Sequence, residues 1–166
     1  MKIGIISDTH DNVPNLEKAL AWMNQNKIEA LIHCGDLCAP GVLVNVLAPQ
    51  FFKPIHMVFG NVEDFDLLPK KVADYNHIIH YGDVGEFELG GKKIGCVHYP
   101  DEAKKMAETG KYDMVFYGHS HKPWEETINN TKLVNPGTLA GLFQKATFAV
   151  YDTKTEKLEL KILETL

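Results

Sequence analysis

Five short apolar segments of this chain each lead into residues of the kind that bind metal ions. The polar residues lie, in chain order, at positions 7–10, 33–36, 60–63, 98 and 118–121. Short apolar runs that alternate with amphipathic segments predict buried strands that alternate with helices. In an open α/β sheet, binding sites form beyond the carboxyl ends of the strands. The pattern therefore predicts an α/β chain whose polar strand ends gather in one place.

The first half of the chain follows a strand–helix–strand order. The strands expected here are 2–6, 30–33 and 54–59. Asp11 or Asn12 can cap a helix whose first turn holds Pro14, and a second short helix over 41–47 is expected to end before Pro49. This order predicts parallel pairing with right-handed crossovers.

The second half changes character and predicts hairpins. The expected strand pairs are 86–89 with 92–97 around Gly90-Gly91, 125–128 with 132–134 around 129–131, and 147–151 with 158–163. Between them we expect a helix over 101–109, capped by Asp101 and stopped at Gly110, and a strand over 113–117. Parallel units followed by antiparallel strands predict two packed sheets with helices outside, in one domain over 1–166. The class is α/β, or α+β in some schemes.

Composition limits the function further. The formal net charge is −5 and no basic cluster is present, which argues against nucleic acid as a partner. The opening segment is too short for a signal peptide or a membrane span. Three cysteines form no disulfide framework, so a cytoplasmic location is expected. Cys34 and Cys38 could form half of a zinc site, but no second close pair completes it.

Seven residues are candidate metal ligands. They are Asp8, His10, Asp36, Asn61, His98, His119 and His121. Taken singly, an Asp or Asn after a strand often forms a turn, and a lone histidine such as His33, His56, His77 or His80 is usually structural. The pair His119 and His121 is harder to dismiss, because residues i and i+2 of an extended segment face the same way. The same geometry is expected for Asp8 and His10.

The number and type of these ligands point to two ions. One ion rarely recruits seven mixed oxygen and nitrogen groups, whereas two ions can share a bridging carboxylate. The amide of Asn61 is neutral, so the site stays positive enough to favour an anionic substrate such as a phosphate ester. Imidazole ligands without thiolate suit Mn²⁺, our first expectation, or Fe, Zn²⁺ or Ni²⁺, rather than Cu(I), Ca²⁺ or Mg²⁺.

These residues resemble the motif set of the calcineurin-like metallophosphoesterases. That set is Asp-x-His, Gly-Asp, Gly-Asn, a single His and Gly-His-x-His. This chain has the set in the same order: Asp8-Thr9-His10, Gly35-Asp36, Gly60-Asn61-Val62-Glu63, His98 and Gly118-His119-Ser120-His121. Asn135-Pro136-Gly137-Thr138 and the short length are similar to the small prokaryotic phosphodiesterase branch of the family.

The resemblance implies a fold and an activity. The fold is a four-layer αββα sandwich with two mixed β-sheets. The first ion is held by Asp8, His10, Asp36 and His121, and the second by Asp36, Asn61, His98 and His119. Asp36 bridges the two ions, and a hydroxide between them attacks phosphorus. Asp36, Asn61 and His98 are thus expected to act in catalysis as well as in metal binding. The expected enzyme is a metal-dependent phosphodiesterase that acts on a small phosphodiester.

Two departures from the family pattern bear on the substrate. Many relatives have a histidine after Gly-Asn that protonates the leaving group, but Val62 stands here and cannot donate a proton. Glu63 follows it and is expected to support the ligands or to form a turn. Relatives often continue the single His with Gly-His, whereas this chain continues His98 with Tyr99-Pro100. We therefore expect a preference for diesters with low-pKa leaving groups, such as aryl phosphodiesters. Tyr99 either lines the pocket or has only a packing role.

Three other functions stay open. The small subunit of retromer has a similar fold but acts as a protein-binding scaffold, so a non-catalytic metal-binding scaffold is the main alternative. A nuclease of the same superfamily fits less well, because this chain is short and acidic. A regulatory metal sensor has no specific feature in its favour. The sequence does not determine the physiological substrate or the ion bound in the cell. It also leaves the oligomeric state open, and a homo-oligomer is one option.

Overall fold

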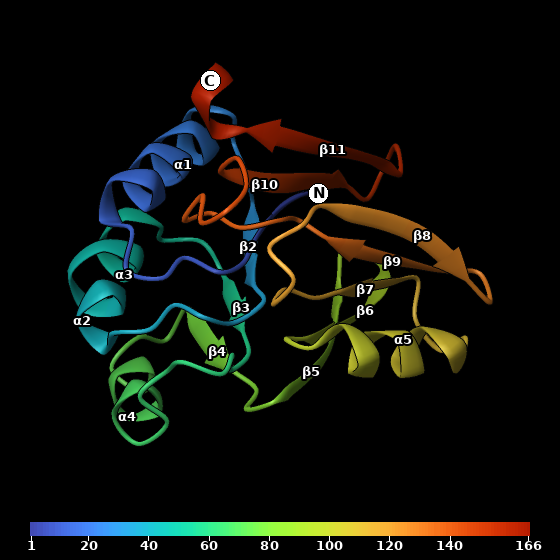
Figure 1. The fold of residues 1–166 in the computed structure, drawn as a ribbon, viewed down its shortest axis with the longest axis horizontal. Coiled ribbons are helices and arrows are strands. Elements are labelled where there is room, and N and C mark those ends of the chain that lie inside the picture. Colours follow the sequence, from blue (N-terminus) through green and yellow to red (C-terminus); the bar gives the residue numbers. More distant parts are fainter.

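Two β-sheets face each other in the computed structural model, which describes residues 1–166 (Figure 1). The six-stranded sheet has the order β11 (Lys157–Ile162), β10 (Thr147–Asp152), β1 (Lys2–Ile6), β2 (Ala30–His33), β3 (Ile55–Met57) and β4 (Ile78–His80). The five-stranded sheet has the order β5 (Val84–Leu89), β6 (Lys92–Val97), β7 (Met114–Phe116), β9 (Thr131–Asn135) and β8 (Trp124–Ile128). Both sheets are mixed: β1 to β4 pair in parallel and β10 pairs antiparallel to β1, while β6, β7 and β9 are parallel between antiparallel edge strands.

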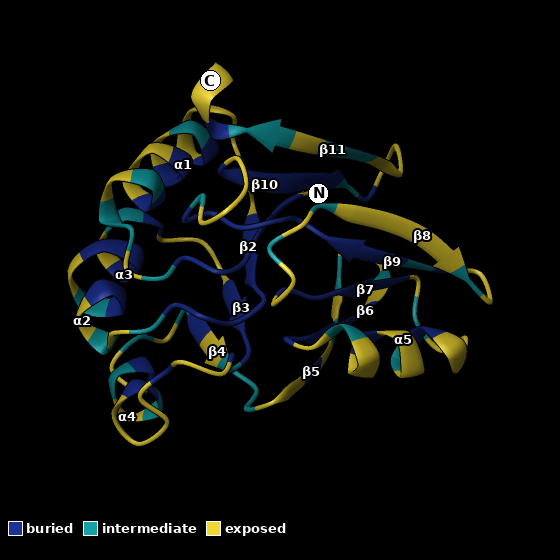
Figure 2. Cartoon of the chain, viewed as in Figure 1, coloured by how far each residue is buried: buried dark blue, intermediate teal, exposed yellow.

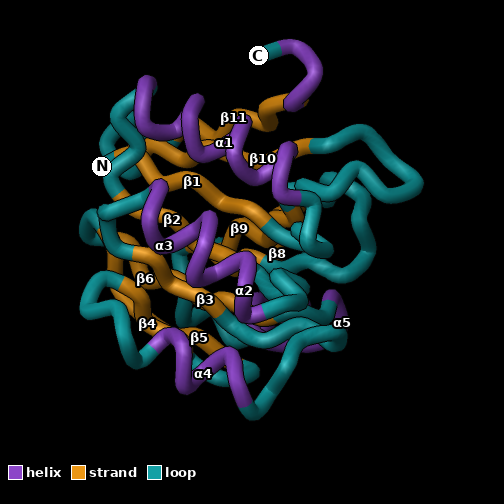
Figure 3. Tube along the Cα trace, turned by 90° about the vertical axis from the view of Figure 1, so that its left-hand side faces the viewer, coloured by secondary structure: helices purple, strands orange, loops and turns teal.

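Helices cover the outer faces of the two sheets. The six-stranded sheet is covered by α1 (Val13–Gln25), α2 (Pro40–Val42), the π-helical η1 (Leu43–Leu47), α3 (Ala48–Gln50) and α4 (Leu67–Val72). The other sheet is covered by α5 (Pro100–Glu108), and the short 3-10 helix η2 (Leu163–Thr165) lies near the C-terminus. The two groups of helices lie on opposite sides of the molecule (Figures 1 and 3). None of the helices combines the length and apolar character needed to cross a bilayer.

Three apolar cores separate the four layers. Buried residues are concentrated in strands such as β2, β3, β9 and β10 (Figure 2). The largest joins α1 to α4 to the six-stranded sheet and includes Leu20 and Phe148. A second core, with Ile32 and Phe116, lies between the sheets. A third core, which includes Ala103 of α5, lies between that helix and the five-stranded sheet. The expected four-layer αββα sandwich with two mixed sheets is therefore confirmed.

The sequence signals for α1 act as expected. The side chain of Asn12 caps the helix by accepting a hydrogen bond from the Asn15 amide at 3.2 Å, and Pro14 lies in the first turn. Asp11, the other candidate cap, instead accepts a hydrogen bond from the Ala39 amide at 2.9 Å. Asp11 therefore joins the loop after β1 to the loop after β2.

The prediction that Pro49 ends the second helix was wrong. Helical backbone begins at Pro40 and continues to Gln50. The middle of this segment is π-helical, and the Ala48 amide bonds to the carbonyl of Leu43. Pro49 follows this wide turn at the start of α3, where a missing amide donor costs little.

Other boundaries differ from the prediction by a few residues. The cap of α5 is Tyr99 rather than Asp101, because Pro100 takes the first helical position. The turn before β9 contains two residues rather than three, since Thr131 already belongs to the strand. In the first hairpin Gly90 and Gly91 both have positive φ, as a two-residue type I′ turn requires. The short α4 and β4 were not predicted, because neither is long enough to give a clear periodic pattern.

Candidate metal centre

Loops at the carboxyl ends of five strands bring all seven candidate ligands together. Asp8 and His10 follow β1, Asp36 follows β2 and Asn61 follows β3 in the six-stranded sheet. The remaining ligands, His98, His119 and His121, follow β6 and β7 in the five-stranded sheet. Contacts below 4 Å link all seven into one cluster. The site thus lies where the ends of both sheets meet.

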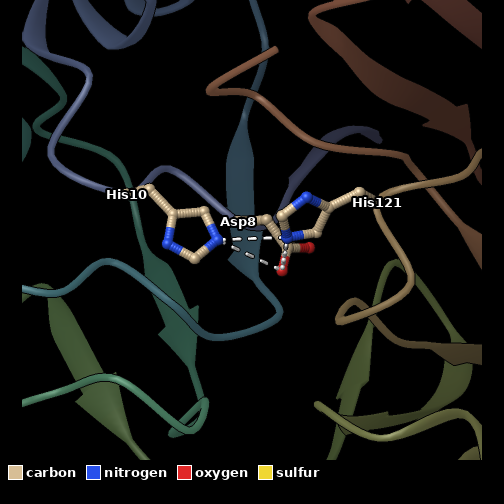
Figure 4. A group of neighbouring side chains, drawn as sticks. All are labelled: Asp8, His10 and His121. Atoms are coloured by element: carbon tan, nitrogen blue, oxygen red, sulfur yellow. Dashed lines mark hydrogen bonds and ion pairs between the residues drawn. The ribbon is translucent and has the colours of Figure 1, made fainter. Parts of the chain in front are cut away.

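Asp8, His10 and His121 form one group of converging side chains (Figure 4). The Oδ1 atom of Asp8 lies 3.3 Å from Nε2 of His121 and 3.9 Å from Nε2 of His10. The two histidine Nε2 atoms are 3.1 Å apart. Three potential ligand atoms therefore point toward one position.

A second group forms around Asp36 and His98. The Oδ2 atom of Asp36 lies 3.4 Å from Nε2 of His98 and 3.7 Å from Nε2 of His10. The Oδ1 atom of Asn61 lies 3.1 Å from Nε2 of His98 and 3.0 Å from Nδ1 of His119. One carboxylate, that of Asp36, thus lies between the two groups.

The backbone at these ligands is mostly left-handed rather than extended. Positive φ angles of 43–66° occur at Asp8, His10, Asp36, His119 and His121. The expectation that His119 and His121, and likewise Asp8 and His10, point the same way as residues i and i+2 of an extended segment was therefore wrong. They still converge on the cluster, but His119 contacts Asn61 and His121 contacts Asp8. Left-handed non-glycine residues carry strain that the surrounding structure must hold, and they concentrate at functional sites.

Backbone groups fix the orientation of the ligands. The carbonyl oxygen of Cys34 accepts a hydrogen bond from Nδ1 of His98 at 2.8 Å, which leaves Nε2 free to face Asp36. The amides of Asn61 and Val62 donate to Oδ1 of Asp36 at 2.7 and 3.1 Å, so its Oδ2 turns toward the cluster. The amide of His119 donates to both carboxylate oxygens of Asp8 at 3.2 Å.

Two buried residues, Glu63 and His33, support the loops that carry the ligands. The buried carboxylate of Glu63 accepts hydrogen bonds from the amides of Leu37 and Gly60, and so it ties the loop after β2 to the loop after β3. His33 was expected to be structural. Its Nε2 atom lies 2.9 Å from the hydroxyl of Thr9, the residue between the ligands Asp8 and His10 in the chain. The position of Glu63 after Gly-Asn predicted a supporting or turn role, whereas nothing in the sequence separates His33 from other buried histidines.

The Asn-Pro-Gly-Thr segment supports the loop that holds the histidine pair. The Nδ2 atom of Asn135 donates to the carbonyl of Gly118 at 2.8 Å and to the Ser120 hydroxyl at 3.0 Å. The hydroxyl of Thr138 donates to the Asp8 carbonyl at 3.0 Å. This segment therefore joins the loops after β1 and β7.

The cluster has two buried carboxylates and no lysine beside them. Asp8 is 0% exposed and Asp36 is 2% exposed, and their ion-pair partners within 4 Å are all histidines. Burial raises the pKa of Asp8 despite a hydrogen bond from Ser7 and the nearby imidazoles. Burial also opposes ionisation of Asp36, but hydrogen bonds from His98, Val62 and Asn61 hold its pKa at about 2.

The donor set fits divalent transition-metal ions. Buried carboxylates without compensating charge are costly, and a bound cation removes that cost. The converging atoms are imidazole nitrogens and carboxylate or amide oxygens, a mixture that suits Mn, Fe, Zn or Ni. His98 also has the backbone hydrogen bond on its far nitrogen that metal-binding histidines usually make.

The cysteines do not form the half zinc site that the sequence left open. Cys34 is buried between the sheets, with its Sγ 3.7 Å from Sγ of Cys96. Cys38 lies instead beside His10, with its Sγ 3.6 Å from Nδ1 of that ring. The two side chains therefore contact different parts of the molecule.

Comparisons with known proteins agree with the geometry. Residues 1–156 match the calcineurin-like phosphoesterase superfamily domain. A phosphodiesterase of Methanocaldococcus jannaschii is 32% identical over 168 residues, which cover 99% of this chain and 100% of the relative. The solved structure of an archaeal phosphodiesterase matches with a TM-score of 0.88 and 29% identity, covering 98% of this chain and 99% of the other.

A third similarity concerns the fold alone. Vps29 of Entamoeba histolytica, solved in complex with Zn²⁺, matches with a TM-score of 0.72 at 17% identity, covering 98% of this chain and 99% of the other. The family match spans nearly the whole chain and includes all seven clustered residues. This chain belongs to the calcineurin-like phosphoesterase superfamily, the family of metal-dependent phosphoesterases.

Proposed function

We propose that residues 1–166 form a single metallophosphoesterase domain that hydrolyses phosphodiesters at two divalent metal ions. The observation that carries the proposal is the pair of buried carboxylates, Asp8 and Asp36, surrounded by four imidazoles and one amide and by no lysine. Such a set is unstable as a structural core unless cations complete it.

The contacts support a division of the ligands between two ions. Asp8, His10, Asp36 and His121 would hold the first, and Asp36, Asn61, His98 and His119 the second. The Oδ2 atom of Asp36 lies within 4 Å of both His10 and His98, which is the arrangement that a bridging ligand needs. Two divalent ions held by these residues would supply a hydroxide nucleophile near neutral pH and would stabilise charge on the phosphoryl oxygens. Mn²⁺ is the first candidate, with Fe, Zn²⁺ and Ni²⁺ as alternatives.

The ligands of the chain set the net charge of this centre and the positions of the ions. Only two carboxylates face two doubly charged ions, because Asn61 contributes a neutral oxygen. The centre therefore keeps positive charge that attracts a phosphate diester. Burial lowers the pKa of His98, but its contact with the Asp36 carboxylate raises it, and the net shift is upward. The two side chains therefore stabilise each other. Asp36, Asn61 and His98 would thus contribute to catalysis by fixing the positions of the ions.

The leaving group must depart with little help from the protein. The side chain of Val62 stands beside Asn61, is 45% exposed and cannot donate a proton. General-acid catalysis typically contributes about 10²–10⁴-fold. A leaving alcohol of low pKa departs readily without a general acid. Aryl phosphodiesters should therefore be better substrates than alkyl phosphomonoesters.

The main alternative is a metal-binding scaffold with no activity. Both functions involve bound metal, so metal binding alone does not distinguish them. A nuclease is less consistent with a net charge of −5, because strand binding relies on basic surface. Hydrolysis of a small diester is therefore the decisive measurement.

The test uses bis(p-nitrophenyl) phosphate, with and without Mn²⁺, on the wild type and Asp36→Asn. The variant keeps an oxygen that can accept from the Asn61 and Val62 amides, so the loop should fold. We expect Mn²⁺-dependent hydrolysis by the wild type and a loss of at least about 100-fold in kcat/KM in the variant. A metal-loaded wild type without activity on a range of diesters would support the scaffold instead.

A further inference from the structure

A cavity of about 320 Å³ opens directly beside the proposed second ion. Its inner wall includes Asn61 and His98, two of the proposed ligands of that ion. His98 is only 2% exposed, so the cavity reaches an otherwise closed part of the centre. A phosphate held at the ions would therefore have one of its ester groups within reach of this cavity.

The side wall of the cavity is aromatic. Phe59 and Phe65 pack edge to face with ring centroids 5.0 Å apart, and Phe65 is 51% exposed. Tyr99 also lines the cavity, is 40% exposed and packs against His119 with ring centroids 4.8 Å apart. Three aromatic rings thus present surface to solvent around the site where an ester group would lie.

Two carboxylates complete the lining. Asp83 comes from the loop between β4 and β5, and Glu102 comes from the first turn of α5. Both are exposed, and neither makes an ion pair or receives a hydrogen bond within the protein. No lysine lines the cavity. Negative charge beside a centre that must attract an anion weakens that attraction unless the substrate offsets it.

We propose that the physiological diester carries a positively charged ester group, an alkylammonium alcohol, which this cavity binds. Aromatic faces and carboxylates together are the groups that bind ammonium cations, through cation–π attraction and charge pairing. The phosphate would occupy the metal centre while the ammonium group lies between Phe65, Tyr99 and the two carboxylates. This inference rests on the proposed phosphodiesterase function and names its substrate class.

Neither a role in stabilising α5 nor a neutral or anionic ester group accounts for the whole lining. Glu102 can stabilise the N-terminus of α5, but Asp101 does the same in the same turn without lining the cavity. That role also leaves Asp83 unexplained. A neutral nucleoside would use the aromatic wall but gains nothing from two unpaired charges, and an anionic ester group would be repelled by them.

The experiment compares two diesters that share the p-nitrophenolate leaving group. One is p-nitrophenyl phosphocholine, and the other is its isostere, in which an uncharged 3,3-dimethylbutyl group replaces the choline group. Since leaving group and shape are the same, their ratio of kcat/KM measures the charge alone. We expect the choline ester to be favoured by roughly fivefold to tenfold, the size of a cation–π contact at a partly exposed site together with weak charge pairing.

Variants assign that ratio to the cavity. Asp83→Asn with Glu102→Gln should lower the ratio clearly, leaving only the part that the aromatic faces of Phe65 and Tyr99 contribute. Asp101→Asn is the matched control, because it removes one charge from the same helix turn outside the cavity, and it should keep the wild-type ratio. If Asp101→Asn lowers the ratio as much as the double variant, general surface charge is the cause and the inference is wrong.

The remaining outcomes separate the inference from the function on which it rests. If the wild type hydrolyses bis(p-nitrophenyl) phosphate but shows no preference for the choline ester, the cationic substrate is excluded and the phosphodiesterase function stands. A higher kcat/KM for the p-nitrophenyl ester of thymidine 5′-phosphate would identify a nucleobase pocket instead. If the metal-loaded protein hydrolyses none of these esters, the proposed function fails and the inference fails with it.

Discussion

The Nε2 atoms of His10 and His121 face each other at 3.1 Å, although 111 residues separate them in the chain. Both also approach the same oxygen, Oδ1 of Asp8, at 3.9 and 3.3 Å. A hydrogen bond between two neutral imidazoles would use one nitrogen as donor and leave the carboxylate poorly satisfied. A cation between the three atoms would satisfy all of them, which is the basis of the first prediction.

His121→Ala and His119→Ala should each remove a different metal ion. His121 contacts Asp8, whereas His119 contacts Asn61 on the other side of Asp36. Calorimetric titration of the chelator-treated protein with Mn²⁺ should show two ions for the wild type and one tightly bound ion for each variant. The double variant should bind neither ion tightly. A wild-type stoichiometry of one would contradict the two-ion proposal.

Gly60→Ala should damage the centre through direct overlap. A Cβ atom at Gly60 would collide with the amide nitrogen and Oδ1 of Asp36 and lie 2.6 Å from its Cγ. The proposed bridging carboxylate would then have to move. We expect a loss of roughly 1–3 kcal/mol in the free energy of unfolding and at least a tenfold loss of activity, measured by urea denaturation and diester hydrolysis.

Gly41→Ala is the matched control for that substitution. The added Cβ would meet only the Nδ2 atom of Asn45, at 3.8 Å, and the residue lies in the helical segment that begins at Pro40. Alanine is favoured over glycine in a helix by up to about 1 kcal/mol, so this variant should be as stable as the wild type or more stable. Equal behaviour of the two glycine variants would show that the close approach to Asp36 is not what matters at Gly60.

Val62→His should broaden the leaving groups that the enzyme accepts. Only the backbone amide of Val62 contacts Asp36, and its side chain is 45% exposed, so the change should leave the loop folded. A histidine at this position supplies a proton donor beside Asn61. We expect kcat/KM for alkyl phosphate esters to rise by about 10²-fold, with little change for p-nitrophenyl diesters.

The control for this prediction is Val62→Gln, which is polar but cannot donate a proton in catalysis. It should behave like the wild type on both classes of ester. A rise on alkyl esters that is equal for histidine and glutamine would indicate a polar contact rather than acid catalysis. An aryl preference that persists unchanged in Val62→His would mean that the leaving group departs on another side of the centre.

Strand-end patterns carry most of the fold and of the candidate centre, because apolar runs and their polar ends are local in sequence. The order of β1 to β3 and the capping of α1 by Asn12 follow from such local signals. The π-helical turn before Pro49 could not be anticipated, because it depends on how the segment packs against α1 and the sheet.

The centre shows the same division between local and distant information. The residue types of the ligands are visible in the sequence, but the left-handed backbone at His119 and His121 is not. It is imposed by contacts from distant segments, such as the hydrogen bond from Asn135 to the Gly118 carbonyl. The cavity between Phe65 and Tyr99 depends likewise on two loops from different sheets.

His56 gives a pH dependence that is separate from the metal centre. It is buried on β3, stacks on Phe87 at 4.4 Å and contacts the Tyr81 hydroxyl through Nδ1 at 2.8 Å. Burial lowers the pKa of His56 to about 4, whereas an unfolded histidine titrates near 6.5. Between these values the unfolded chain binds a proton that the folded chain does not, so stability falls as the pH falls.

His56→Phe should therefore reduce the acid sensitivity of the fold. The phenyl ring can keep the stacking contact but cannot be protonated, which removes a slope of about 1.4 kcal/mol per pH unit from the free energy of unfolding between pH 6.5 and 4. Urea denaturation of the metal-free protein at pH 7, 5.5 and 4.5 measures this slope. Tyr81→Phe is the control, because it breaks the same hydrogen bond and leaves the imidazole able to titrate. If both variants show the wild-type slope, the charge state of His56 does not govern acid unfolding, and the buried His33 becomes the next group to test, since burial lowers its pKa to about 3.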